Sequence, residues 1–131
     1  METPRPTILI LEDDNFISTF LKAKFDEQFD TIMAADTAAA RQALDQRTVD
    51  LIILDIILPR EDGYHFLQEL KKSGSPHRRI PVIILSNIDD PADIKRGLKL
   101  GAMEFLIKAN QVPEDIVRKV ATYLTRPAPG A

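Results

Sequence analysis

Apolar residues in this chain come in short unbroken runs, separated by longer segments with a helical repeat. Runs of four or five apolar residues without alternation are typical of strands buried on both faces of a parallel sheet. These runs predict strands over residues 8–11, 31–34, 51–54, 81–85 and 104–107. One run is the most informative, because Asp55 interrupts it and Pro59 and Gly63 then force a loop.

The segments between the runs have the spacing of amphipathic helices. They predict helices over residues 15–25, 38–46, 64–72, 92–100 and 113–124. Asp14 is well placed to cap the first helix. The apolar stripe expected to face the core on that helix consists of Ile17, Phe20, Leu21 and Phe25. Strands and helices that alternate five times predict an α/β domain with a parallel sheet and helices on both faces.

The chain has 131 residues, which is the size of one domain. Residues 1–7 contain Pro4 and Pro6 and are expected to form a short disordered arm, with the folded domain over 8–124. Residues 125–131 are expected to be a Pro-rich tail or the stub of a linker. The chain is therefore either a stand-alone domain or a domain excised from a longer protein.

Composition excludes several classes of function. The net charge of −3 gives direct nucleic-acid binding no electrostatic support. The absence of cysteine excludes disulfides and thiolate metal sites. No segment approaches the roughly 20 apolar residues that cross a bilayer, and the N-terminus has no apolar signal region. We therefore expect a cytoplasmic protein that does not bind membranes.

Polar residues with complementary chemistry follow four of the predicted strands. Glu12 and Asp13 follow the first, Asp55 the third, Ser86 the fourth and Lys108 the fifth. The carboxyl ends of parallel strands meet at one edge of the sheet, which is where open α/β sheets bind ligands. We therefore expect these five side chains to converge.

Three carboxylates in a small space repel one another unless a cation or a proton relieves them. Oxygen ligands alone favour Mg²⁺, or Mn²⁺, over zinc. An aspartate beside such an ion can act as a nucleophile and form an aspartyl-phosphate. The oxygens of the transferred phosphoryl group would then be stabilised by the metal, the Ser86 hydroxyl and the Lys108 ammonium.

In four motifs, residues 7–124 resemble the response-regulator receiver domains of two-component signalling, the CheY-like family. These are Leu-Glu-Asp-Asp at 11–14, Asp-Ile-Ile-Leu-Pro-Arg-Glu-Asp-Gly at 55–63, Leu-Ser-Asn at 85–87 and Gly-Ala-Met-Glu-Phe-Leu-Ile-Lys at 101–108. Each motif is weak alone, but their order and spacing are highly specific. The resemblance implies a flavodoxin-like sheet of order 2-1-3-4-5.

The resemblance also implies a function, that of a phosphoacceptor switch in a two-component phosphorelay. Such a domain takes a phosphoryl group from a sensor histidine kinase or a histidine phosphotransfer protein. It then changes the face that binds a downstream protein target, and can form a homodimer through its fourth helix, fifth strand and fifth helix. It catalyses only its own phosphorylation and dephosphorylation, so we do not expect an enzyme that acts on a separate substrate.

By position, Asp55 resembles the phosphoacceptor of the family. Asp13 resembles its direct metal ligand and Glu12 a ligand that acts mainly through water. The backbone carbonyl of Ile57 would be a further ligand. The residues that resemble the remaining site and switch positions are the hydroxyl residue Ser86, the lysine Lys108 and the switch aromatic Phe105, which turns inward on activation.

Three departures from the family pattern alter the expectations. Ala109 stands where proline, often with a cis bond, usually follows the lysine, and a cis bond to alanine costs about 2.5–4 kcal/mol, so we predict trans. Asn87 stands where a small residue usually follows Ser86, and would crowd the phosphoryl group. Ile57 and Ile88 are apolar at positions that influence attack by water, which predicts slow dephosphorylation.

Competing interpretations remain open for some residues. Asp14 is more simply a helix cap than a ligand, and Phe105 is as readily a core residue as a switch. Phe16 lies beside the core stripe of the first helix, where an exposed ring would suit docking of the phosphodonor and a buried one would pack under a loop.

Three other functions have to be weighed. A protein-interaction module that keeps the fold without being phosphorylated is compatible with Ala109 and Asn87. A haloacid-dehalogenase-like phosphatase is disfavoured, because such enzymes carry a second aspartate where this chain has Ile57. A flavin site is disfavoured, because no Ser/Thr/Gly-rich phosphate loop follows the first strand.

Overall fold

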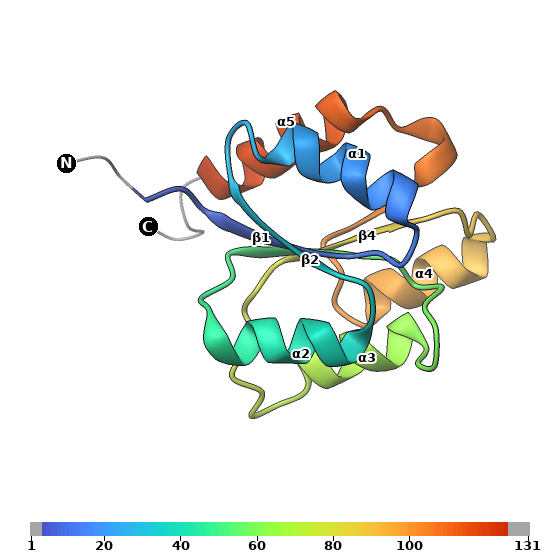
Figure 1. Cartoon of the computed structure of the whole chain (residues 1–131). Helices are drawn as coiled ribbons and strands as arrows, with labels where there is room; N and C mark the ends of the chain where they lie inside the picture. The colour runs from blue at the N-terminus through green and yellow to red at the C-terminus, as the bar shows by residue number, and fades with distance from the viewer. Residues whose placement is uncertain (1–3, 126–131) are drawn as a thin grey trace.

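A computed structural model describes residues 4–125 as a five-stranded parallel sheet between two layers of helices (Figure 1). The strand order is β2-β1-β3-β4-β5, as the resemblance implies. All ladders are parallel, which confirms the interpretation of the unbroken apolar runs. The strands are β1 (Thr7–Leu11), β2 (Asp30–Ala34), β3 (Leu51–Leu54), β4 (Val82–Ser86) and β5 (Glu104–Ile107).

Five α-helices connect and follow these strands. They are α1 (Asn15–Phe25), α2 (Thr37–Gln46), α3 (Gly63–Lys71), α4 (Pro91–Lys99) and α5 (Pro113–Thr125). Helices α1 and α5 cover one face of the sheet, and α2, α3 and α4 cover the other (Figure 1). The predicted bounds differ from these by no more than one residue at any end. The sequence pattern did not predict the short 3-10 turn η1 (Lys108–Asn110).

Aspartates cap four of the helices at the edge of the sheet where the strands end. The Asp14 carboxylate accepts hydrogen bonds from the N–H groups of Phe16 and Ile17, which confirms its predicted role as a cap. A side-chain oxygen at this position satisfies donors that have no partner within the helix. The other aspartate caps are Asp36, Asp62 and Asp90.

The core consists of two apolar layers, one on each face of the sheet. In β3, Ile52 and Leu54 contribute to the layer under α2 and α3, whereas Leu51 and Ile53 contribute to the layer under α1 and α5. Successive side chains of a strand point to opposite faces, so a strand covered on both faces needs apolar residues at every position. This burial explains the unbroken run before Asp55.

The prediction that Phe20 faces the core is wrong. Its side chain is 54% exposed, whereas Leu21 and Phe25 on the same helix are buried. Phe16 is 77% exposed, as docking would require, and its ring centroid lies 6.0 Å from that of Phe20. The apolar arc of α1 is wider than the surface it buries, so two aromatic rings remain on the outside.

The chain ends differ slightly from the expected boundaries. Strand β1 begins at Thr7, and the Arg5 guanidinium donates to the Asp26 carbonyl at 2.7 Å, so residues 5–7 are tied to the domain. Thr125 is the last residue of α5. The arm and tail otherwise stay predictions, because residues 1–3 and 126–131 lie outside the described part of the chain. Within residues 4–125, no helix has the length and apolar character needed to cross a membrane.

A polar network joins α2 to the loop and helix that follow β3. The Glu61 carboxylate accepts from the Thr37 hydroxyl at 2.6 Å and from the Arg41 guanidinium at 2.7 Å. Arg41 also pairs with Glu69 on α3, at 2.9 Å. The Arg41 guanidinium, followed by the Thr37 hydroxyl, lowers the pKa of Glu61 to about 2. Glu61 thus anchors the segment between Asp55 and α3.

Replacing Glu61 with Gln should destabilise the protein by about 2 kcal/mol at pH 7, because Arg41 loses a charge-assisted partner. The pKa of Glu61 in the folded state lies below its ordinary value of 4.5. Its contribution to the free energy of unfolding is therefore present above pH 4.5 and is lost as the pH falls toward 2. Urea unfolding of parent and variant at pH 7 and pH 3 measures this. Glu69→Gln, at a more exposed partner, should have a smaller effect. An equal loss for Glu61→Gln at both pH values would contradict the electrostatic explanation.

Candidate functional site

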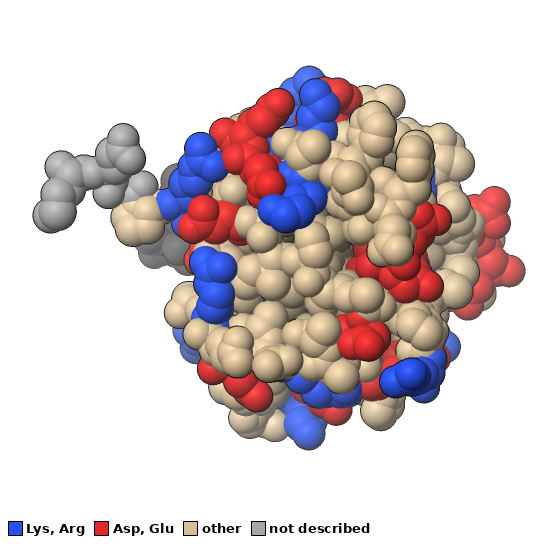
Figure 2. Space-filling view, in the orientation of Figure 1, with Lys and Arg blue, Asp and Glu red and all other residues tan. Residues whose placement is uncertain are grey.

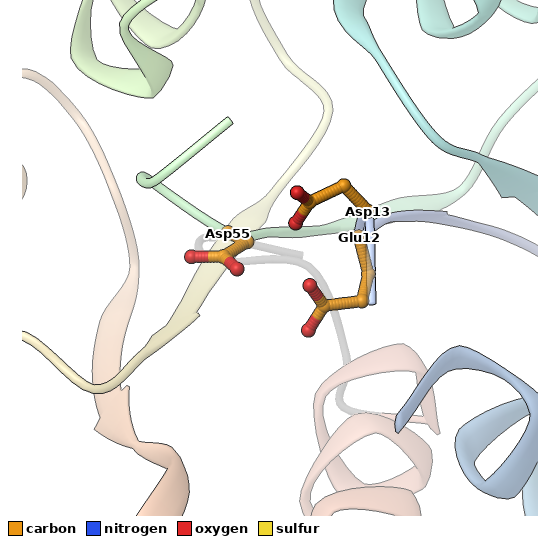
Figure 3. Close-up of side chains that lie close together, drawn as sticks. All are labelled: Glu12, Asp13 and Asp55. Carbon is orange, nitrogen blue, oxygen red and sulfur yellow. The ribbon is translucent and has the colours of Figure 1, made fainter. Parts of the chain in front are cut away.

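Three carboxylates meet where β1 and β3 end. Glu12 and Asp13 follow β1, and Asp55 follows β3. The ladder pairs Leu11 with Leu54, and the Asp55 N–H donates to the Leu11 carbonyl at 3.0 Å. Oxygens of the three carboxylates lie within 4.8 Å of one another, and the side chains point into one shared space (Figure 3). The register of two neighbouring strands therefore builds the acidic cluster that the sequence predicted.

Burial differs among these three side chains. Glu12 is 4% exposed and Asp55 is 6% exposed, whereas Asp13 is exposed to solvent. A buried carboxylate is unfavourable without a partner of opposite charge. Asp13 forms the open side of the cluster, where an ion from solvent would arrive.

Lys108 supplies a positive charge from the far side of the site. Its ammonium lies 2.8 Å from Asp55 Oδ2 and 2.5 Å from Glu12 Oε1. Burial by itself would lower the pKa of Lys108, but the two carboxylates outweigh this effect and raise it. Burial raises the pKa of Glu12 to about 7, with Lys108 opposing the shift and Asp55 adding to it. One ammonium therefore only partly compensates the buried acids.

The donor set fits a hard divalent cation. Glu12 Oε1 is fully buried, and the Lys108 ammonium lies at ion-pair distance from it. The exposed carboxylate of Asp13 is open to a cation from solvent. Three oxygen ligands without nitrogen or sulfur suit Mg²⁺ or Mn²⁺. Glu12, Asp13 and Asp55 could therefore hold a metal ion.

The loop after Asp55 is held against its carboxylate. The Ile57 N–H donates to Asp55 Oδ1 at 3.1 Å, which turns the backbone around the acid, and the Ile57 side chain is 61% exposed. The Gly63 N–H donates to the Ile56 carbonyl at 3.0 Å. A Cβ at Gly63 would lie 2.5 Å from Ile56 Cα and 2.8 Å from the Asp55 carbonyl oxygen. The sequence showed Gly63 only as a loop signal and did not reveal this backbone contact.

Ser86 is the last residue of β4 and is fully buried. The ladder pairs it with Ile107, the residue before Lys108, so its hydroxyl and the lysine leave neighbouring strands at the same edge. Among residues 4–125, its Oγ accepts one long hydrogen bond, from the Ile88 N–H at 3.5 Å. Such a weakly bound hydroxyl can rotate toward a new acceptor.

Phe105 lies on β5 under α4. It is half-buried and packs against the core layer on that face. A Cβ at Gly97 of α4 would lie 3.1 Å from a Phe105 ring carbon and 2.6 Å from Ile84 Cδ1. Glycine thus lets α4 approach the sheet beside the ring, so movement of α4 and rotation of Phe105 would be coupled. The inward rotation itself stays a prediction.

The sequence did not reveal a contact between α3 and α4. The Tyr64 hydroxyl donates to the Asp93 carbonyl at 2.8 Å, and the Arg96 guanidinium lies 4.3 Å from the centroid of the Tyr64 ring. Cation–π stacking of this kind holds two helices together without an apolar contact. No periodic pattern signals such a pair, because its members are far apart in the sequence.

An apolar hollow of about 270 Å³ opens beside Lys108, between α1 and α5. Its rim carries the exposed rings of Phe16 and Phe20. Residues that line it deeper are Leu21, Leu85, Pro113 and Ile116. Figure 2 shows a group of acidic side chains on the side toward which the strands of Figure 1 point, and acidic and basic side chains interspersed over the rest of that face.

The peptide bonds of residues 4–125 are all trans, including the bond between Lys108 and Ala109, as predicted. The Ala109 N–H donates to the side-chain carbonyl of Asn87 at 3.1 Å. Two of the positions that depart from the family pattern, Asn87 and Ala109, are therefore in direct contact, which the sequence did not indicate.

Solved structures support the fold and the family together. The receiver domain of the Francisella response regulator 1452 aligns with a TM-score of 0.83 and 32% identity, over 92% of this chain and 98% of that one. The response regulator Rcp1 in its Mn²⁺-bound form aligns with a TM-score of 0.79 and 25% identity, over 98% and 100% of the two chains. The second structure holds a metal of the class that suits the acidic cluster here.

Curated relatives are longer than this chain. A probable transcriptional regulator ycf27 from Cyanophora paradoxa is 30% identical over 127 residues, which is 96% of this chain and 51% of the relative. The regulator of RpoS from Escherichia coli K12 is 34% identical over 102 residues, which is 77% and 29% of the two chains. The chain thus spans about half the length of the first curated relatives it matches, or less.

The family model for the response regulator receiver domain matches residues 8–121. This range contains the acidic cluster, Ser86 and Lys108, and it covers most of the described chain. The fold, the order of the motifs and the two sets of relatives agree with the match. The chain belongs to the response regulator receiver domain family of two-component signalling.

Proposed function

We propose that this receiver domain is a phosphoacceptor switch that takes a phosphoryl group on Asp55 with the help of Mg²⁺. The single observation that carries the proposal is the position of Asp55, which is buried beside two further carboxylates and paired with Lys108 at 2.8 Å. A structural role does not require three acids around one lysine at a strand edge. A site that binds a cation and an anionic phosphoryl group does.

Mg²⁺ would be held by Asp13, Asp55 and the backbone carbonyl of Ile57, with Glu12 acting through a bound water. The ion supplies positive charge that offsets the repulsion between the acids and the incoming phosphate. Asp13 is exposed and provides the entry side, whereas Glu12 is buried and limits how far the ion can move inward. Mn²⁺ would satisfy the same ligands.

The transfer uses side chains that already converge. An Asp55 carboxylate oxygen attacks the phosphorus of a phosphohistidine, the new P–O bond forms and the P–N bond breaks. The imidazole of the donor leaves with the electron pair. The Lys108 ammonium and the Ser86 hydroxyl donate hydrogen bonds to the phosphoryl oxygens, whose charge would otherwise be unfavourable in this buried position.

The switch would then spread from Ser86. Its hydroxyl accepts a long hydrogen bond from the Ile88 N–H and would rotate to donate its own hydrogen to the phosphoryl group, and the end of β4 would follow. Phe105 turns inward as α4 adjusts, because Gly97 holds that helix close to the ring. The population of the two arrangements of α4, β5 and α5 shifts accordingly.

The partners follow from this mechanism. The phosphodonor is a sensor histidine kinase or a histidine phosphotransfer protein, docked on the exposed rings of Phe16 and Phe20 beside the hollow near Lys108. A downstream protein reads the face of α4, β5 and α5, which also allows a homodimer. We place the exchange in the cytoplasm and expect no direct contact with nucleic acid or membrane. The domain catalyses only its own phosphorylation and dephosphorylation.

Intact mass after incubation with acetyl phosphate and Mg²⁺ tests the proposal. We expect one added phosphoryl group in the parent and none in Asp55→Asn, which keeps the shape but lacks the nucleophilic oxygen. Omission of Mg²⁺ should suppress the addition. An addition that persists in Asp55→Asn would contradict the assignment of the site. If a folded parent that binds Mg²⁺ gains no phosphoryl group, the proposed uptake from small phosphodonors is contradicted.

The phosphorylated form should persist for minutes or longer once the donor is removed. Ile57 and Ile88 offer no polar group that could orient water for attack on the phosphoryl group. The decay of the added mass over time gives the lifetime directly. A half-life of seconds would refute this expectation.

A second candidate function is a protein-interaction module that is never phosphorylated. The contact between Asn87 and Ala109 favours it in one respect, because it gives the lysine-bearing turn a fixed partner without a phosphoryl group. The intact set of Glu12, Asp13, Asp55 and Lys108 favours the phosphoacceptor. A phosphatase remains disfavoured, since the exposed Ile57 cannot serve as a general acid.

A further inference from the structure

The turn that carries Lys108 is not capped by the residue that precedes it. Lys108 is the first residue of η1, and Ile107 before it offers no side-chain cap. The first N–H groups of any helical turn have no partner within the turn and need an acceptor from elsewhere. For Ala109 the acceptor comes from the loop after β4, because the Ala109 N–H donates to the Asn87 side-chain carbonyl at 3.1 Å.

The sheet places Asn87 where it can do this. Ser86 pairs with Ile107 in the last step of the β4–β5 ladder, so Asn87 and Lys108 leave neighbouring strands side by side. The side-chain carbonyl of Asn87 thus extends the ladder by one hydrogen bond after the backbone pairing ends. A proline at position 109 would have no N–H to donate, so this bond needs a residue other than proline at 109 together with the side-chain acceptor of Asn87.

The Lys108 side chain projects from the first residue of this turn. The lysine reaches from β5 past β4 to Asp55, at 2.8 Å, and to Glu12, at 2.5 Å. A long flexible side chain keeps such a geometry only if its backbone is held. After the backbone pairing of β4 with β5 ends, the hydrogen bond from Ala109 to Asn87 connects the residue after β4 to the first turn after β5.

We propose that Asn87 is a positioning residue, which caps the turn at Ala109 and so holds the Lys108 ammonium against Asp55. The proposal rests on the proposed function, since it assigns Asn87 a part in phosphoryl uptake. It also reverses the expectation that Asn87 merely crowds the phosphoryl group. Crowding predicts faster uptake when Asn87 is shortened, whereas positioning predicts slower uptake.

Hydrogen exchange at the Ala109 amide tests the cap. In Asn87→Ala this amide should exchange roughly fivefold faster, the factor that one hydrogen bond of ordinary strength contributes. Asn87→Asp keeps an acceptor oxygen and should retain most of the protection. Asn110→Ala is the matched control, because it removes an exposed asparagine from the same turn. Unchanged exchange at Ala109 in Asn87→Ala would overturn the proposal.

The rate of phosphorylation by acetyl phosphate with saturating Mg²⁺ tests the positioning role. Asn87→Ala should slow uptake about threefold to tenfold in the parent, but less than twofold in an Ala109→Pro background, which already lacks the N–H donor. Equal slowing in both backgrounds, or faster uptake in Asn87→Ala, would overturn the role. If Ala109→Pro fails to fold, the direction of the change in Asn87→Ala and the exchange at Ala109 still decide it.

The two proposals fail in different ways. A parent that takes up no phosphoryl group overturns the proposed function and the positioning role with it. A parent that is phosphorylated, with no change at Ala109 or in rate on loss of the Asn87 side chain, overturns the positioning role alone.

Discussion

Replacing Lys108 with Met should lower the free energy of unfolding by about 3 kcal/mol in the absence of divalent metal, because two buried carboxylates lose their counter-ion. Glu12 and Asp55 are both nearly inaccessible, and Lys108 is within ion-pair distance of each. Methionine keeps most of the aliphatic stem, so packing changes little. The site would then contain acids whose repulsion only protonation relieves.

Saturating Mg²⁺ should restore most of that loss, since an ion bound only by the folded state stabilises it by mass action. Urea unfolding with and without Mg²⁺ measures both effects. Lys99→Met, an exposed lysine on α4, is the matched control and should change stability by less than about 0.5 kcal/mol. A loss in Lys108→Met that Mg²⁺ leaves unaltered would show that the lysine acts through packing and not through charge.

Replacing Gly63 with Ala should destabilise the fold by about 3 kcal/mol and weaken Mg²⁺ binding. The added methyl would lie 2.5 Å from Ile56 Cα and 2.8 Å from the Asp55 carbonyl oxygen, both of which are backbone atoms. Backbone at the end of a central strand cannot move aside as a side chain can. The segment from Asp55 to Ile57 must therefore shift, and with it the proposed metal ligands.

Gly74→Ala separates this contact from a general effect of losing glycine. Gly74 has φ of +88°, but a Cβ there would meet no atom within 4 Å. Its replacement with alanine should lower the free energy of unfolding by only about 1 kcal/mol, through backbone strain. Urea unfolding and Mg²⁺ titration of both variants measure the difference. Equal losses of stability, with unchanged Mg²⁺ affinity in Gly63→Ala, would contradict a role for the close approach.

Local pattern determined the elements and the parallel direction of the strands, whereas the strand order followed from the resemblance to receiver domains. The five strands and five α-helices of the described chain follow from apolar runs and helical spacing, because burial on two faces restricts a central strand to apolar residues. The 3-10 turn η1 does not follow from them. The sequence also placed five site side chains at one edge of the sheet: Glu12, Asp13, Asp55, Ser86 and Lys108. Parallel strands all end on the same side, so their last residues converge wherever the strands lie in the order.

Only the tertiary structure decided how those residues touch. Which face of α1 is covered depends on α5, and the sequence therefore misassigned Phe20. The close approach at Gly63 depends on how the loop folds back on Ile56, and the partner of Asn87 depends on the register of β4 with β5. Periodicity determines which residues can be buried. Contacts between segments far apart in the chain depend on packing that no local pattern records.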